Sequence, residues 1–442
     1  MKNFKKILFS YALVTFMIVT SCSLDITNPN QATDNEVLGN AEGIRNLAVG
    51  LQGFYAETAL PAAIFAPAVT TREMAINTTF ASLVELEQGG TVLPPENSRV
   101  NRLWNNMMRA IDMAEQLIEN APNVIVDSGE LSGIVALSEI HKAMALGYLI
   151  QSFQQSPVST GENAQFFSRD EVLAESISLL QSALNRITTN PPSVNFNQNI
   201  IFSGFDIENT IHAYLARHHL LAGNYQDAIN ASNQVDPSAV SVFTYDGSIS
   251  RNPVFQGVLS GDEGQEYAPR DNFGTPVTEE GDERIEFYLE PADNFSIPNG
   301  LPIDILKGFF SSPSSPIPVY LPGEMNLIRA EAFVNLNQPQ NAVNEINIVR
   351  TKTSSEDPFG LGANLPEYTG SLDEQSLFTE IYRQRTAELY LTGLRFDDMR
   401  RLGRPAPSGT NPPLEAERNR IWYPYTTQER QNNTNTPPNP DI

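Results

Sequence analysis

The sequence is poor in cysteine and in basic residues, and each shortage excludes a class of protein. With one cysteine among 442 residues, the chain cannot form an internal disulfide and is not a cysteine-rich zinc or iron–sulfur protein. Its 28 Lys and Arg residues stand against 52 Asp and Glu, which gives a formal net charge of -24. Because nucleic-acid affinity comes mostly from basic side chains, we expect no nucleic-acid partner.

The apolar content is sufficient for a large folded body. Hydrophobic residues make up 40% of the chain at a mean hydropathy of -0.26, which is typical of a water-soluble protein with a large core. The 31 prolines and 27 glycines indicate long ordered connections rather than wholesale disorder.

The N-terminus has the layout of a secretory signal. Lys2, Lys5 and Lys6 precede an apolar run over residues 7–19, which is shorter than the roughly 20 residues of a membrane-spanning helix. We therefore expect residues 1–21 to be a signal peptide that is removed.

The single cysteine follows this signal directly. Val19-Thr20-Ser21-Cys22 resembles the bacterial lipobox, in which the cysteine is acylated before cleavage; the alternative is a small residue at an ordinary cleavage site. Several acyl chains hold a protein stably on a bilayer. We expect Cys22 to be lipidated and the polar residues 22–40 to form a flexible tether.

The body has the periodicity of helices. Apolar residues recur at helical spacing over 103–119, 134–150 and 173–184, and the second segment is apolar over most of its circumference, so it should be central. Residues 210–235 and 322–350 each read as two helices joined by a short turn, and these hairpins resemble tetratricopeptide units at irregular spacing.

Two further patterns concern local structure. Ser371 and Glu374 fit a capping box, which predicts a helix start at Ser371. Residues 238–318 are rich in proline, glycine and acidic clusters, contain short extended candidates such as 285–289, and are too long for an ordinary connection. Long irregular stretches on a rigid scaffold are where binding usually occurs.

The predicted fold is therefore mainly α. Tetratricopeptide-like helical hairpins form a scaffold that carries a long, irregular, loop-rich insertion and a few short strands. We expect residues 41–442 to form one domain, with its variable binding region over about 238–318.

Short motifs along most of the chain fall in a characteristic order. In the most specific stretch, 383–401, the pattern consists of Arg385, Glu388-Leu389, Gly393, Arg395, Phe396, Asp397, Met399 and Arg400-Arg401. The others are Leu24–Asn30, Trp104 with Arg109, Ile111 and Ala114, Asp282-Glu283-Arg284, Lys307-Gly308-Phe309, Ile328–Ala332 with Ala342, Ile346-Asn347 and Val349-Arg350, Trp422-Tyr423-Pro424 and Gln431–Asn433. This order resembles the SusD/RagB family of outer-membrane nutrient-binding lipoproteins.

The resemblance implies a non-enzymatic receptor without a cofactor. Such a protein is lipid-anchored at the outer membrane, faces outward, binds a nutrient oligomer such as a glycan, and delivers it to a SusC-like TonB-dependent transporter. Three alternatives stay open: peptide capture by the same architecture, a tetratricopeptide-type protein-interaction scaffold, and a lipid-anchored hydrolase that uses two carboxylates.

Sugar binding needs an aromatic face bordered by amide and carboxylate groups. We assign Trp104 and Trp422 to structural motifs, which leaves aromatics that we expect to be exposed on loops: Tyr55, Phe65, Phe80, Tyr245, Phe255, Tyr267 and Phe273. Tyr267 and Phe273 flank Arg270-Asp271-Asn272. The predicted ligand site therefore consists of Tyr267, Arg270, Asp271, Asn272 and Phe273, with Tyr55.

Other polar clusters have structural interpretations. Adjacent helical residues point about 100° apart, so His218-His219 is a poor metal pair, and we expect His218 to pack between helices. The alternating charges over 395–401 predict salt bridges and caps, and Glu388 should pair with an arginine. The acidic stretch 279–283 lacks EF-hand spacing and is predicted to be a solvated loop. We expect no metal site.

Overall fold

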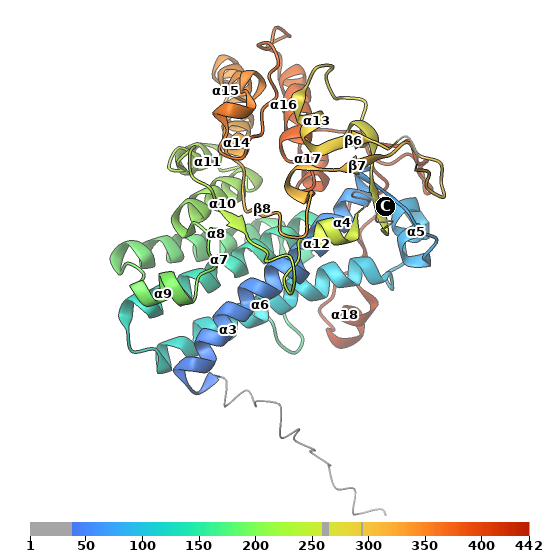
Figure 1. Cartoon of the computed structure of the whole chain (residues 1–442). Helices are drawn as coiled ribbons and strands as arrows, with labels where there is room; N and C mark the ends of the chain where they lie inside the picture. Colours follow the sequence, from blue (N-terminus) through green and yellow to red (C-terminus); the bar gives the residue numbers. More distant parts are fainter. Residues whose placement is uncertain (1–37, 259–264, 293–294, 442) are drawn as a thin grey trace, which may run out of the picture.

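The structure is a computed structural model that describes residues 38–258, 265–292 and 295–441. The predicted signal peptide, the lipidation site Cys22 and nearly all of the tether lie outside the described residues. Figure 1 shows long helices crossing the lower part of the molecule, shorter helices α14, α15 and α16 above them, and short strands to one side.

Three long helices form the base of the scaffold, and their apolar periodicity explains them. α6 (Ser98–Val124), α7 (Ser128–Ser152) and α8 (Arg169–Thr189) extend the three predicted segments, and α7 packs against both of the others. Among the described helices, only α7 is long and apolar enough to cross a membrane, and its apolar window is entirely buried inside the protein. The predicted central position of this helix is confirmed.

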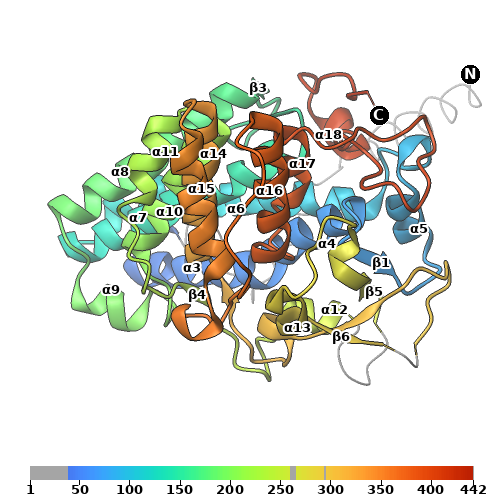
Figure 2. The same cartoon turned by 90° about the horizontal axis from the view of Figure 1, so that it is seen from above.

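Two helical hairpins occur where the sequence predicts them. α10 (Ile207–Leu221) and α11 (Tyr225–Ser232) form the first, and α14 (Pro322–Asn335) and α15 (Pro339–Thr351) form the second. Gly223 closes α10 with a φ of 75°, in the left-handed region that glycine adopts without steric cost. α11 packs on α14, so the hairpins are neighbours (Figure 2).

Further helices complete the scaffold. They are α3 (Ala41–Phe54), α4 (Leu60–Thr70), α5 (Ala81–Gln88), α9 (Val194–Asn199), α12 (Pro253–Gly257), α13 (Glu283–Tyr288), α16 (Glu374–Glu388), α17 (Arg395–Arg401) and α18 (Thr427–Asn432).

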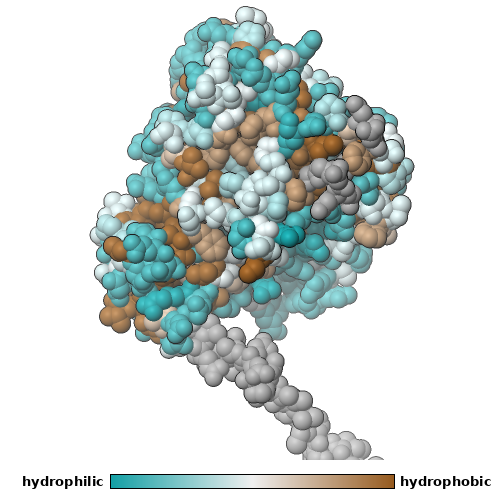
Figure 3. All heavy atoms as spheres, in the orientation of Figure 1, coloured by the Kyte–Doolittle hydropathy of each residue, from teal (hydrophilic) through white to brown (hydrophobic). Residues whose placement is uncertain are grey.

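The space-filling view shows hydrophobic residues gathered near α3 and α9, where Val49 and Val194 are exposed (Figure 3).

The strands form two-stranded antiparallel pairs. The pair that matters for the site joins β1 (Met74–Ile76) to β5 (Tyr267–Pro269), with Ile76 opposite Tyr267. The other pairs are β2 (Gln155–Ser156) with β3 (Phe167–Ser168), β4 (Val242–Phe243) with β8 (Ile317–Pro318), and β6 (Leu289–Pro291) with β7 (Asp304–Leu306).

Three local predictions are wrong. α16 begins at Glu374 rather than at Ser371, because the Asp373 carboxylate accepts from the backbone N–H of Ser376 and caps the helix. Residues 285–288 belong to helix α13, not to a strand, because the Asp282 carboxylate caps that helix. The acidic stretch 279–283 is not simply solvated, because Asp282 is buried and Glu279 pairs with Arg350.

His218 packs between helices, as predicted. Its buried imidazole donates through Nδ1 to Oγ of Ser176 on α8 at 2.8 Å, and that hydroxyl donates to the backbone oxygen of Ala143 on α7. Gly147 makes room for the ring, because a Cβ there would lie 2.5 Å from Nε2 of His218. Burial lowers the pKa of His218 to about 3 and that of His141 to about 4.

A buried ion network joins the middle region to the helical scaffold. The Arg284 guanidinium on α13 contacts Asp282 at 2.7 Å and Glu388 of α16 at 3.0 Å, and Lys352 reaches the same Glu388 at 2.8 Å. Burial by itself raises the pKa of Glu388, but the charges of Lys352 and Arg284 outweigh it and hold that pKa below its ordinary value. The predicted pairing of Glu388 with an arginine is confirmed.

The charged segment 395–401 also pairs as expected. Asp397 contacts Arg169, Arg400 and Arg401, all at 3.0 Å or less. Asp398 pairs with Arg385 at 2.8 Å. These contacts attach α17 to α8 and α16, and the salt-bridge interpretation of this cluster is confirmed.

Removal of Arg284 should destabilise the fold. Arg284→Met leaves Asp282 and Glu388 buried with fewer partners, so we expect a loss of about 3–5 kcal/mol in the free energy of unfolding, measured by urea denaturation. Lys307→Met is the matched control, because its pair with Glu290 is solvent-exposed and should cost less than about 1 kcal/mol. Equal losses in the two variants would contradict the proposed importance of the network.

Stability should fall with acidification before the carboxylates titrate. An unfolded histidine takes up its proton near pH 6.5, whereas folded His218 does so only near pH 3. Between these values the unfolded state binds more protons, so the free energy of unfolding drops by about 1.4 kcal/mol per pH unit for each such histidine.

The measurement is the slope of unfolding free energy between pH 6.5 and pH 5. His218→Gln should lower this slope by about 1.4 kcal/mol per pH unit. His212→Gln, at a half-buried position, should change the slope less. An unchanged slope in His218→Gln would refute the assignment.

Candidate functional site

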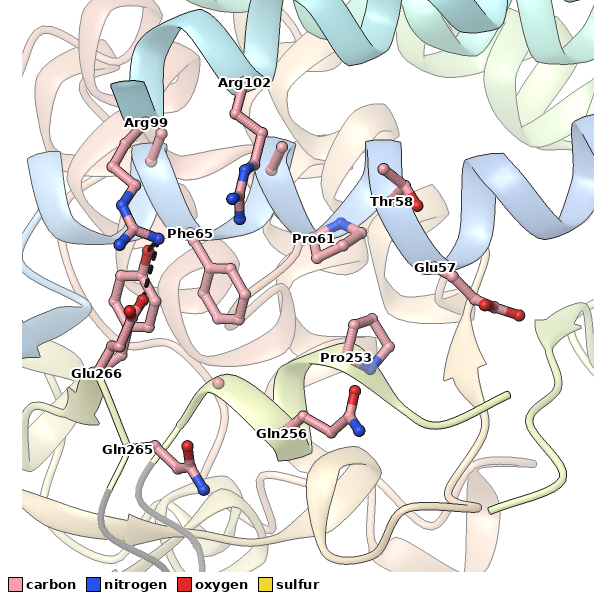
Figure 4. A pocket seen from close by; sticks show the side chains of 14 residues that line it. Glu57, Thr58, Pro61, Phe65, Arg99, Arg102, Pro253, Gln256, Gln265 and Glu266 are labelled. Atoms are coloured by element: carbon pink, nitrogen blue, oxygen red, sulfur yellow. Dashed lines mark hydrogen bonds and ion pairs between the residues drawn. The ribbon is translucent and has the colours of Figure 1, made fainter. Parts of the chain in front are cut away.

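An open cleft of about 380 Å³ lies between helices α4, α6 and α12 and strand β5 (Figure 4). Its walls come from three separate parts of the sequence. The lining residues are Glu57, Thr58, Pro61, Ala62, Phe65, Ala66, Arg99, Arg102, Pro253, Gln256, Gly257, Gln265, Glu266 and Tyr267.

A π-helical turn, Tyr55–Ala59, forms one end of the cleft and joins α3 to α4. Such turns interrupt the regular backbone hydrogen bonding of a helix and often occur at functional sites. Side chains satisfy two of its carbonyl oxygens: Ala56 accepts from the Tyr245 hydroxyl at 3.1 Å, and Thr58 accepts from the Asn106 amide at 3.0 Å. The turn brings Glu57 and Thr58 to the edge of the cleft.

Two stacked aromatic rings form the floor. The rings of Phe65 on α4 and Tyr267 on β5 are parallel within 4°, with their centroids 4.4 Å apart. Tyr267 is buried, while Phe65 is half-buried and faces the cleft (Figure 4). Gly257 allows this arrangement, because a Cβ there would lie 2.7 Å from Cζ of Phe65. Burial raises the pKa of Tyr267 to about 12, so its hydroxyl stays protonated at neutral pH.

Charged and polar groups border this floor. Nη1 of Arg99 on α6 lies 3.0 Å from Glu266 and 3.5 Å from the Tyr267 hydroxyl. These contacts attach α6 to the start of β5. Arg102 extends from α6 into the cleft (Figure 4). At the far end, the Ser250 hydroxyl donates to Glu57 at 2.6 Å.

Of the predicted ligand residues, Tyr267 lies in the cleft and the others do not line it. Arg270 donates to the backbone oxygen of Pro302 at 3.0 Å and pairs with Asp271 at 3.6 Å. Asn272 is exposed on the same short segment, with a φ of 47°.

The predicted exposure of four loop aromatics is wrong, because Tyr245 and Tyr267 are buried and Phe273 and Tyr55 have no exposed surface at all. Phe273 packs on Tyr390 with ring centroids 4.5 Å apart, and Tyr55 packs edge-on against His141 at 5.2 Å. Neither ring offers a face to a ligand.

The remaining aromatic candidates are scattered. Phe65 lines the cleft, Phe80 is exposed outside it, Tyr245 is buried, and Phe255 is half-buried. Trp104 is buried in the core, as expected for a structural residue. Trp422 is half-buried, and the Arg400 guanidinium lies 3.7 Å from its ring centre.

Sequence reasoning missed the residues on α6 and α12. Arg99 and Arg102 stand three residues apart on a helix, which places them on one face, and Glu266 directly precedes Tyr267. The spacing of the two arginines could have indicated a shared helix face from the sequence. Only the tertiary structure shows that this face of α6 meets strand β5.

The arrangement suits binding of a ligand with both apolar and polar surfaces. A flat aromatic ring accepts an apolar face, and the surrounding guanidinium, carboxylate and amide groups offer hydrogen bonds in several directions. In the described part of the chain, no group of three or more His, Cys, Asp or Glu side chains is arranged to hold a metal ion.

Solved structures share this fold over nearly the whole described body. A SusD superfamily protein from Bacteroides vulgatus is 14% identical, with 92% of this chain and 98% of that chain covered at a TM-score of 0.66. A SusD-like carbohydrate binding protein from the same organism is 16% identical, with 90% and 97% covered and a TM-score of 0.66. A SusD-like protein from Bacteroides fragilis is 13% identical, with 92% and 98% covered and a TM-score of 0.69.

At such low sequence identities, these comparisons show that the fold is shared and nothing more. No curated protein sequence matches the chain. The sequence model described as the SusD family matches residues 312–440, which include the segment 383–401 that carries the most specific resemblance. Residues 312–440 therefore match the SusD family, and the described body as a whole has the fold of SusD-like structures.

Proposed function

We propose that this protein binds a carbohydrate oligomer in the cleft between α4, α6, α12 and β5. The observation that carries the proposal is the stacked pair of Phe65 and Tyr267, with one half-buried ring facing a cleft bordered by charged and amide groups. The apolar face of a pyranose packs on such a ring, while its hydroxyl groups need the surrounding donors and acceptors. The carbohydrate-binding description of a SusD-like structure from Bacteroides vulgatus supports this ligand class.

The surface beyond Glu57 supports an oligomer rather than a single sugar. A second open hollow of about 450 Å³ also contains Glu57 in its lining, together with Ser250 and the segments 198–203 and 244–246. Glu57 therefore borders both hollows. A ligand longer than one ring can extend from the aromatic floor across this side chain.

The protein is proposed to bind its ligand without chemical change. The two carboxylates of the cleft are both engaged, Glu266 by Arg99 and Glu57 by Ser250. Oriented in this way, they serve as positioned acceptors for ligand hydroxyls. Incubation with any oligosaccharide that binds should therefore leave it intact.

We further propose that the protein is anchored by a lipid at Cys22 to the outer membrane and delivers its ligand to a TonB-dependent transporter. The support is the lipobox-like sequence Val19–Cys22 and the match of residues 312–440 to the SusD family. Copurification of a transporter from native membranes tests the partnership.

Truncation of the aromatic floor should weaken ligand binding. Phe65→Ala removes the stacking face, and we expect affinity for a bound oligosaccharide to fall at least tenfold, measured by isothermal titration calorimetry after an oligosaccharide array identifies ligands. Phe80→Ala is the matched control, since Phe80 is 58% exposed and does not line the cleft. It should bind like the unmodified protein.

Peptides should be screened in the same array as the oligosaccharides, because peptide capture is the alternative function. Binding of peptides without any oligosaccharide would reject the proposed ligand class. Equal affinities of Phe65→Ala and the unmodified protein would reject the proposed site.

Substitution of the lipidation site should release the protein from the membrane. We expect Cys22→Ser to remove the acyl-dependent mass increase of the mature N-terminus and to shift the protein to the soluble fraction of its host, because membrane attachment then lacks its acyl chains. Mass spectrometry and membrane fractionation measure these outcomes. An unmodified Cys22 in the native protein would disprove the anchor but not the binding site.

A further inference from the structure

Nearly every basic side chain that the structure describes has an acceptor within the protein. The three lysines of the described ranges pair with carboxylates, and most arginines pair with carboxylates or donate to backbone oxygens. Within residues 38–258, 265–292 and 295–441, only Arg102, Arg109 and Arg251 have neither an ion pair nor a hydrogen bond to a protein acceptor. All three are exposed.

Two of these arginines follow one wall of the cleft. Positions 99, 102, 106 and 109 of α6 have the spacing of a single helix face. Asn106 donates to Thr58 in the π-helical turn at 3.0 Å, which places this face along the cleft edge. Arg102 projects into the cleft (Figure 4), and the Arg109 guanidinium lies 4.8 Å from the ring centre of Phe54, just before the turn.

The third arginine, Arg251, lines neither hollow, although its sequence neighbours do. Arg251 lies on the segment between Ser250, which donates to Glu57, and Pro253, which lines the cleft. Of the three unpaired guanidinium groups of the described residues, Arg102 therefore lies in the cleft and Arg109 lies further along the same helix face.

The lining of the cleft is balanced in charge, although the whole chain is strongly acidic. Arg99 and Arg102 balance Glu57 and Glu266 in a protein of net charge -24, and Arg99 is paired with Glu266, which leaves the Arg102 guanidinium free to meet a ligand. At physiological salt, charges separated by more than about 8 Å are largely screened. The distant carboxylates therefore contribute little repulsion, and within the lining Glu266 is paired with Arg99 and Glu57 accepts from Ser250, which leaves Arg102 for a charged ligand.

We propose that the ligand of this cleft is an acidic oligosaccharide, with one anionic substituent paired to Arg102 and a neighbouring one placed near Arg109. The substituent is a carboxylate or a sulfate ester. The planar fork of a guanidinium matches either group with two parallel hydrogen bonds, whereas a sugar hydroxyl uses only part of it. This inference rests on the proposed carbohydrate binding and specifies its ligand class.

Matched pairs of oligosaccharides test it. Uronic-acid oligomers are compared with their carboxyl-reduced forms, and sulfated oligomers with their desulfated forms, by calorimetry at two salt concentrations. We expect the acidic member of at least one pair to bind about tenfold more tightly and to weaken as salt rises. The pair that shows this difference identifies the anionic group.

Two variants assign the effect to a residue. Arg102→Gln should lower affinity for the acidic member about tenfold and leave affinity for the neutral member nearly unchanged. Arg430→Gln removes the same charge from an exposed arginine on α18, outside the cleft lining, and should change neither affinity.

The possible outcomes distinguish failure of the acidic ligand class from failure of the proposed carbohydrate binding. Equal binding of acidic and neutral members, with Arg102→Gln unchanged, overturns the acidic ligand class and leaves carbohydrate binding standing. No binding of any oligosaccharide in the panel overturns the proposed function, and the inference with it.

Discussion

Buried arginines attach the irregular middle region to the helical scaffold, and the cleft depends on this attachment. Arg284 meets Glu388 of α16 inside the protein, and Arg395 of α17 donates to the backbone oxygen of Phe273 at 2.6 Å. Because a buried charge without acceptors costs several kcal/mol, these contacts tie the loops to one position on the helices.

The geometry of the site follows from that fixed position. Strand β5 pairs with β1, which follows α4, so Tyr267 is held beside Phe65 of that helix. The contact between Arg99 and Glu266 ties the same strand to α6. A site whose walls are already held in place loses less conformational freedom on binding, which favours ligand affinity. The acidic-ligand inference extends this picture, since Arg102 is the one charged side chain of the lining without an ion pair or hydrogen bond to another described residue.

The long elements of the fold were predictable, and the errors have local causes. The periodicity of 134–150 predicted the buried α7, and the turn at Gly223 predicted a helical hairpin. The start of α16 was misplaced because Asp373 competes with Ser371 as a cap and prevails. In the site, Tyr267 was identified, but Phe273 was assigned to the surface although Tyr390 covers it.

The sequence alone determined the helical character of the body, the excess of acidic groups and the lipobox-like sequence at Cys22, because each is a property of neighbouring residues or of simple counts. The tertiary structure alone decided that Phe65 rather than Phe273 faces a cleft, and that Arg99 is neutralised whereas Arg102 is not. Exposure and charge pairing depend on contacts between residues far apart in the chain, and no local pattern encodes those contacts.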